Sequence, residues 1–348
     1  EHSELEDRLF SEEQVPKPLL EALDAHLGEL PEDVRAAARK ASSGSWGEAF
    51  GENAVADELF QAWHTARFVE QVAVAGRREY ALPLLVNCWL DKGKPAGSYP
   101  TGGPVARVMP VWKAAAPSID IVCPDIYVRS FCDVCDSYHT KENPLGIVET
   151  ATHSYLGLRA IWAICHHHAP IFAPFGFEEM GEPFTALQGF LFGMDVSDPA
   201  LSTPQDKHAY HETMQLLEEL VSCQTERGIE GSMLDAVIAE RGLEQQLAFG
   251  HAALKAAFTQ DVRGAVALLQ LGWDEEAGVA EALVLASGAK LSFASLEEGR
   301  PFADVLALEE GEWTEGMWRR RRRLNGDELQ ILSCVSPTLL KVRVLLFS

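Results

Sequence analysis

Four short apolar runs alternate with helical patterns between residues 80 and 227, and this alternation restricts the fold more than any other feature of the chain. The runs are YALPLLVNCWL (80–90), IDIVCPDIY (119–127), NPLGIVE (143–149) and IFAPFGF (171–177). Helical spacing of apolar residues separates them, around 105–116, 130–139 and 154–168, and a last helix is expected at about 206–227. Strands that alternate with helices indicate βα units and a parallel sheet buried on both faces.

A long helix is expected ahead of these runs. In residues 54–78, Leu59, Trp63, Phe68 and Val72 recur at helical spacing and predict one apolar stripe.

Two features indicate which kind of parallel sheet to expect: the absence of glycine-rich phosphate loops and the polar residues at the strand ends. The glycine-rich phosphate loops GxGxxG and GxxxxGK[ST], expected of a doubly wound sheet, are missing from the sequence. Polar or aromatic residues stand instead at the carboxyl ends of the expected strands: Asn87 and Trp89, Asp125 and Tyr127, Glu149, then Phe175 and Glu178. In a (β/α)8 barrel that end is the active-site face. Four βα units make half a barrel, so residues 1–228 are expected to form a partial (β/α)8 barrel, preceded by a helical segment.

Charge excludes two classes of partner. The net charge of −23 argues against nucleic acid and anionic membrane, because both need a cationic surface. Arg319 to Arg323 are the exception, and a solvated strand or loop is the expected setting for such a run in an acidic protein. No apolar run is long enough to span a membrane. Seven cysteines, an odd number, favour a reducing compartment, so a cytoplasmic location is expected.

Beyond residue 229 the apolar period shortens. GAVALLQLGW (264–273), AEALVLASGAKLSFASL (280–296) and LKVRVLLF (340–347) are strand-like, with glycines between them. Residues 229–348 are therefore expected to form a small antiparallel β-sandwich.

Several of these stretches together resemble a known family. EYALPLLVNCWL, GSYPTGGP, IDIVCPDIY, NPLGIVET and APFGF follow one another as in the β-galactosidase-like glycoside hydrolases of families 35 and 42, which are (β/α)8-barrel glycosidases. GEWTEGMWRRRRRLNGDE (311–328) is similar to the β-domain that trails the barrel in one branch of that group. By this analogy, 241–259, which reads equally as helix or strand, is expected to form strands.

The resemblance assigns roles to the strand-end residues. It implies that the third run is barrel strand seven and that Glu149, at its end, is the nucleophile of a retaining enzyme acting on β-galactosides or related glycosides. It also implies that Asn87 and Tyr127 hydrogen-bond sugar hydroxyls or the nucleophile, although capping or packing explains such residues equally well. Trp89 and Phe175 are candidate stacking platforms for a sugar ring, and for Phe175 core packing is the favoured alternative. No cofactor is implied.

The acid/base residue has no match in the chain. The family places it as the Glu of an Asn-Glu pair after strand four, and EHSELEDRLF (1–10) resembles the segment that follows that pair. We therefore expect the first half of the barrel to lie upstream, in a longer natural chain. The alternative is a truncated or pseudoenzyme chain, a non-catalytic remnant that binds carbohydrate. Open sheet edges of a half barrel would favour a homo-oligomer.

Two clusters raise the question of metal or redox chemistry. Cys132, Cys135 and His139 form C-x2-C-x3-H, but a zinc site would need a fourth ligand, and two cysteines on a barrel helix are the simpler explanation. Three consecutive histidines, 166–168, point in different directions around a helix end and suit its free carbonyls. No metal site is predicted from either.

Overall fold

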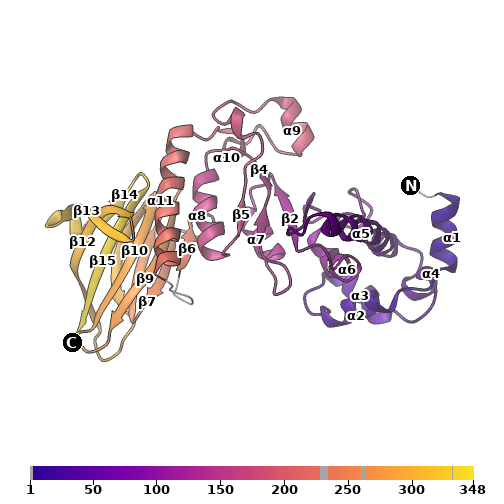
Figure 1. Ribbon diagram of the computed structural model, residues 1–348, viewed down its shortest axis with the longest axis horizontal. Coiled ribbons are helices and arrows are strands. Elements are labelled where there is room, and N and C mark those ends of the chain that lie inside the picture. Colours follow the sequence, from indigo (N-terminus) through magenta and orange to yellow (C-terminus); the bar gives the residue numbers. More distant parts are fainter. Residues whose placement is uncertain (1–2, 228–233, 260–262, 331) are drawn as a thin grey trace. The chain divides into compact units, whose positions relative to one another are not determined.

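The chain divides into two compact units. The computed structural model describes residues 3–227, 234–259, 263–330 and 332–348. The first unit comprises Glu1–Ile126 and Asp136–Glu149, and the second comprises Tyr127–Cys135 and Thr150–Ser348 (Figure 1). The mixed helix-and-strand character expected from the sequence is confirmed. The expected boundary at 228/229 falls among residues 228–233, outside the described part, and stays a prediction.

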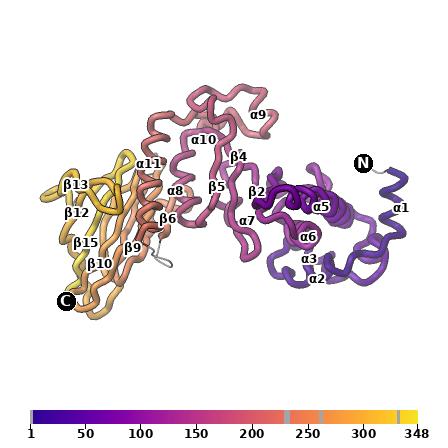
Figure 2. The backbone as a smooth tube through the Cα atoms, in the orientation of Figure 1, coloured from indigo at the N-terminus to yellow at the C-terminus, as the bar shows by residue number. Residues whose placement is uncertain are grey.

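Helices form most of the first unit and precede a short parallel pair of strands (Figure 2). Its elements are α1 (Glu4–Glu12), α2 (Lys17–Ala25), α3 (Glu32–Lys40), α4 (Trp46–Phe50), α5 (Ala54–Glu79), β1 (Leu85–Cys88), η1 (Ala106–Val108), α6 (Met109–Ala115), β2 (Ile121–Ile126) and β3 (Gly146–Ile147). Helix α7 (Phe131–Tyr138) and strand β4 (Glu149–Thr150) each straddle the division.

Helix α5 is the longest element of the first unit and organises its core. The Asn53 side chain starts the helix by accepting hydrogen bonds from two backbone amides of its first turn. Leu59 and Trp63 are buried as expected. Phe68 and Val72 are not, with 65% and 58% of their surface exposed, so the predicted stripe is wrong for the second half of the helix. Small alanines, among them Ala66 and Ala73, occupy the buried positions there, because α5 packs closely on α6.

A three-stranded sheet in the order β1-β2-β4 carries the strand ends of the first unit. Strands β1 and β2 are parallel, with Asn87 opposite Cys123. The carboxyl ends of the two parallel strands therefore meet at one edge of the sheet.

The second unit contains helices followed by the β-structure. Its elements are α8 (Leu156–His166), β5 (Ile171–Phe172), η2 (Phe177–Glu179), α9 (Ala186–Phe192), α10 (Pro199–Ser202), α11 (Lys207–Glu226), β6 (Leu234–Ile238), η3 (Ala239–Arg241), β7 (Glu244–Phe249), β8 (Ala252–Ala257), β9 (Ala265–Asp274), β10 (Val279–Ser287), β11 (Ala289–Ser295), β12 (Phe302–Thr314), β13 (Met317–Leu324), α12 (Asp327–Gln330), β14 (Leu332–Cys334) and β15 (Thr338–Phe347).

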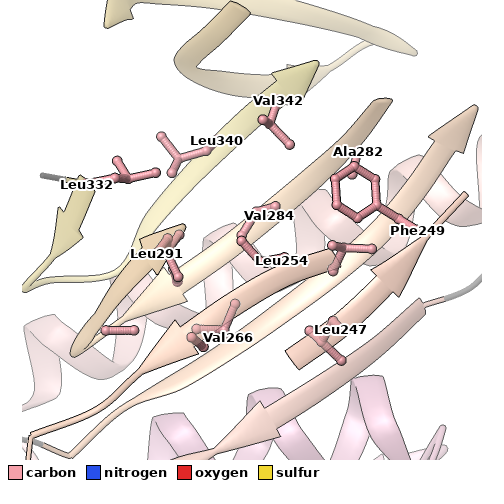
Figure 3. Packing of buried hydrophobic residues seen from close by; sticks show 14 of the residues in the cluster. Leu247, Phe249, Leu254, Val266, Ala282, Val284, Leu291, Leu332, Leu340 and Val342 are labelled. Atoms are coloured by element: carbon pink, nitrogen blue, oxygen red, sulfur yellow. The ribbon is translucent and has the colours of Figure 1, made fainter. Parts of the chain in front are cut away.

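Two antiparallel sheets form the C-terminal part of this unit, as the sequence predicted. Their strand orders are β13-β12-β15-β10-β9-β6 and β14-β11-β8-β7. The sheets share one core, in which Val284, Leu340 and Val342 of the larger sheet pack with Phe249 and Leu291 of the smaller one (Figure 3). Residues 241–259, ambiguous in sequence, form β7 and β8 together with the turn η3.

Helices cover the outer face of the larger sheet. Helix α8 packs on β6 and β9, while α11 packs on β10 and β12 (Figure 1). Glu219 and Glu226 of α11 accept hydrogen bonds from the backbone amide and the indole N–H of Trp313. Because both faces are covered, β9 and β10 are nearly continuous apolar runs rather than alternating ones.

The five consecutive arginines lie on β13, on an exposed strand as expected. Their partners are acidic residues: Arg319 pairs with Glu315, Arg320 with Glu309, Arg321 with Glu312, and Arg322 with Glu310 and Glu328. The run is thus largely neutralised by its own hairpin.

A buried guanidinium ties α8 to the β-structure within the second unit. Arg159, 2% exposed, donates to both carboxylate oxygens of Glu240 at 2.7 and 3.1 Å. Its Nη1 lies 2.7 Å from Nε2 of the buried His153, and its Cζ lies 4.6 Å from the Phe131 ring centre. Burial and the charge of Arg159 hold the pKa of His153 well below its usual range, so the ring is a neutral acceptor.

Replacing Arg159 with methionine should lower the free energy of unfolding of the second unit by about 3–5 kcal/mol, because Glu240 and His153 lose a buried partner. Urea denaturation followed by tryptophan fluorescence measures the change. Arg129→Met is the matched control: its pair with Asp198 involves a side chain 68% exposed, so the loss should stay below about 1 kcal/mol. Equal decreases in the free energy of unfolding for the two variants would show that the buried ion pair stabilises the protein no more than the exposed one.

Candidate functional site

Three polar side chains gather at the carboxyl edge of the β1-β2-β4 sheet. Asn87 stands near the end of β1, Asp125 near the end of β2, and Glu149 begins β4. The amide Nδ2 of Asn87 donates to Oδ2 of Asp125 at 3.3 Å. Asp125 in turn interacts electrostatically with Glu149. The structure therefore brings together two of the predicted site residues, Asn87 and Glu149, with Asp125, which the sequence placed at a strand end without assigning it a role.

The segment before Glu149 is fixed to β2 by one buried side chain. Asn143 is fully buried, and its Oδ1 accepts from the backbone N–H of Val122 at 2.8 Å. Its Nδ2 donates to the backbone oxygens of Val122 and Tyr138 at 3.0 and 2.8 Å. A side-chain amide has the same donor and acceptor as a peptide group, so Asn143 extends the sheet without a further strand. We call these hydrogen bonds of Asn143 to Val122 and Tyr138 the Asn143 clamp. The clamp fixes the position from which the chain continues to Glu149.

A glycine then lets the chain approach β2 closely. A methyl group built on Gly146 would lie 2.8 Å from Sγ of Cys123 and 3.0 Å from Cγ2 of Ile121, inside van der Waals contact. Leu145 and Ile147 on either side are fully buried. The apolar run 145–148 is therefore a buried approach that ends on a half-buried carboxylate, Glu149.

The electrostatics of the site centre on Asp125. Burial, and then the neighbouring charge of Glu149, raise the pKa of Asp125 to about 7, against the lowering effect of the hydrogen bond from Asn87. Two carboxyl groups in one partly buried site resist being charged together. The cluster can therefore hold one proton near neutral pH, which is the property of an acid–base pair.

Trp89 follows β1 in the first unit and is 60% exposed. Its indole face is thus accessible, as a stacking platform requires, and its proposed role stays a prediction.

Tyr127 and Phe175 belong to the second unit, where both contact Phe192. The Tyr127 ring stacks on Phe192 with centres 4.6 Å apart, and Phe175 meets Phe192 edge to face at 5.4 Å. Tyr127 is 4% exposed and packs with Ala151, whereas Phe175 is 51% exposed. The exposure of Phe175 speaks against the core packing that the sequence favoured for it. Phe192 itself was missed, because FLFGMD gives no signal beyond an apolar helix end.

The cysteine pair of the C-x2-C-x3-H motif is buried. Cys132 and Cys135 are buried free thiols, and burial raises the pKa of Cys132 to about 12. A protonated thiol is a poor nucleophile and a poor ligand. Across the described ranges, no group of three His, Cys, Asp or Glu side chains is placed to hold a metal ion. In the same ranges, every helix is too short or too polar to cross a bilayer.

Comparison with known proteins assigns part of the chain to a family model. Residues 210–334 match a domain of unknown function, DUF5597. The match begins inside α11 and covers most of the two antiparallel sheets, which agrees with the packing of α11 on β10 and β12. A search of the curated proteins finds no match.

Gly146→Ala should destabilise the first unit by about 1–3 kcal/mol, because the added methyl group overpacks the contact with Cys123. Adding Cys123→Ala should recover part of the loss, since the two sites share that contact. Thermal unfolding measures both effects. Gly103→Ala is the control, because a methyl group there meets no atom within 4 Å. A Gly146→Ala protein as stable as this control would contradict the close approach.

The raised pKa of Asp125 predicts a pH-dependent stability. Between its ordinary value of 3.8 and about 7 the native state keeps a proton that the unfolded chain releases, so stability falls as the pH rises through this window. Asp125→Asn cannot ionise. Its gain in urea midpoint over the wild type should therefore be larger at pH 8 than at pH 5. Asp24→Asn, an exposed aspartate of α2, should show the same difference at both pH values.

Proposed function

We propose that this chain carries the nucleophile of a retaining glycoside hydrolase, with Glu149 as the nucleophile and β-galactosides or related glycosides as substrates. The observation that carries the proposal is the pairing of Glu149 with Asp125 at the carboxyl edge of β1-β2-β4. Carboxyl groups at neighbouring strand ends are the chemistry that glycosidic-bond cleavage uses. The sequence resemblance to the β-galactosidase-like barrels supplies the substrate class.

The partial barrel is part of the same proposal. Strand β1, helix α6, strand β2 and helix α7 are followed by β4 and α8, which is the order of three βα units. The parallel pairing of β1 with β2, and the place of β4 beside β2, fit consecutive barrel strands. Strands five to seven of a (β/α)8 barrel would then be β1, β2 and β3–β4, with their active-site ends at Asn87, Asp125 and Glu149.

The chemistry follows from an ionised Glu149. Its carboxylate attacks the anomeric carbon, the bond to the leaving oxygen breaks, and a glycosyl ester forms on the protein. The leaving oxygen takes a proton from a second carboxyl group, which later removes a proton from the attacking water. The resemblance assigns that acid/base to an Asn-Glu pair, which does not match any position in this sequence. In the first unit, the exposed side chain of Trp89 would contact the sugar ring.

A mechanism-based label tests the nucleophile directly. On incubation with 2-deoxy-2-fluoro-β-galactosyl fluoride, the chain should gain the mass of one fluorosugar, and peptide mapping should place it on Glu149. Glu149→Gln should abolish labelling and reduce turnover by several orders of magnitude, as loss of a nucleophile does. Glu142→Gln, an exposed glutamate of the same connecting segment, is the control that should still be labelled.

A label on another residue would overturn the assignment of Glu149. Absence of any label, with sugar binding retained in calorimetry, would favour the alternative of a non-catalytic carbohydrate-binding chain. Dinitrophenyl β-galactoside separates the two carboxyl roles, because its leaving group needs no proton. It should release one equivalent of dinitrophenolate even where the acid/base is missing.

A further inference from the structure

Asp125 is bonded on one side only. Its Oδ2 accepts the amide hydrogen bond from Asn87 at 3.3 Å. Its Oδ1 is buried and, within the part of the chain that the structure describes, has no hydrogen-bond partner. The Asp125 side chain thus has one oxygen that is closed off from solvent and that receives no hydrogen bond from the described residues.

An ionised carboxylate is poorly suited to that position. Burying an oxygen that receives no hydrogen bond raises the free energy of a charged carboxylate more than that of a neutral carboxyl group. Glu149 faces it from β4 with a like charge, and the nearby thiols of Cys88 on β1 and Cys123 on β2 have raised pKa values and remain neutral. The positive charge of Lys113 acts on Cys123, where it opposes the rise in the pKa of that thiol. A proton on Oδ1 removes the second charge and converts the unbonded oxygen into a donor.

We propose that Asp125 is a positioning residue that holds a proton at neutral pH, so that Glu149 is the only charged carboxyl group of the pair. The nucleophilic role of Glu149 rests on the proposed function above. The protonated state of Asp125 does not, because it follows from the buried Oδ1, which has no donor among the described residues, and from the neighbouring charge of Glu149.

The expected consequence is that the reactivity of Glu149 depends on pH through the protonation of its neighbour Asp125. While Asp125 is protonated, its O–H can donate towards Glu149 and orient that carboxylate, and the site has a single negative charge for the positively charged transition state. Above neutral pH Asp125 ionises, and both effects are lost. Asparagine at the same position keeps a donor at every pH, whereas alanine has none.

Carbon-13 NMR of aspartate carboxyl groups tests the protonation in the full 348-residue chain without any substrate. The Asp125 signal should titrate with a midpoint near 7. Glu149→Gln removes the neighbouring charge and should lower the midpoint by about one pH unit or more. Asn87→Ala removes the donor to Oδ2 and should raise it. The two opposite shifts identify the signal even if Asp125 variants fail to fold, and Glu142→Gln should leave it in place. An Asp125 that titrates near pH 4, unmoved by Glu149→Gln, overturns the proposal.

The rate of labelling by the fluorosugar fluoride tests the positioning role, because that reagent needs no acid assistance. In the wild type the rate should fall above pH 7. Asp125→Asn should lose this fall with pH, and Asp125→Ala should be slower than Asp125→Asn by about tenfold or more at every pH. A merely structural role would change the rate without changing its pH profile, and that result would also overturn the proposal. If NMR shows the coupled proton but no residue is labelled, the proposed function fails while the protonation of Asp125 stands.

Discussion

The buried amide of Asn143 is the contact on which the site depends. By pairing with the backbone of Val122 it satisfies one donor and one acceptor of β2 that would otherwise lack partners in the core. The next residue, Pro144, has no backbone N–H and so cannot donate a hydrogen bond to a neighbouring strand. The run from Leu145 to Val148 can then pack against β2 as a buried apolar segment, and the carboxylate of Glu149 emerges at the sheet edge. The hydrogen bonds of Asn143 thus act together with the close approach of Gly146 and the pairing of β4 beside β2 to fix the register at which Glu149 appears.

Tyr138 extends this support to the other side of the site. Its backbone oxygen accepts from Asn143, while its phenolic oxygen accepts from the amide of Ala106 at 3.1 Å and lies 3.3 Å from Sγ of Cys88. One residue thus connects the end of β1, the turn before α6 and the clamp of β2. The strands that carry Asn87 and Asp125 are short, so their ends are held by these side-chain bonds as much as by the sheet ladder.

The sequence predicted those parts of the molecule in which a local pattern decides the structure. The first three apolar runs predicted β1, β2 and the pair β3–β4, but Glu149, expected at the end of a strand, is the first residue of β4. The shortened period after residue 229 predicted the antiparallel sheets correctly. The failures concern tertiary packing. Phe68 and Val72 continue the apolar period of α5 yet are exposed, and alanines such as Ala66 and Ala73 occupy the buried positions there. The roles of Asn143 and Asp125 depend on neighbours that are 21 and 24 residues away in sequence, and no local pattern carries that information.

The burial of Asp125 lowers the stability of the fold but places a carboxyl group that can gain and lose a proton next to Glu149. A carboxyl group without a full set of donors destabilises the fold once it ionises, and an asparagine would avoid this cost. An asparagine, however, cannot release or regain a proton. Retaining the acid next to Glu149 makes the total charge of the pair respond to pH near neutrality, whereas two well-solvated carboxylates would both stay charged there. The same physical arrangement, one donor from Asn87 and one buried oxygen without a partner in the described ranges, therefore accounts for both the instability expected at high pH and the proton proposed for the site at neutral pH.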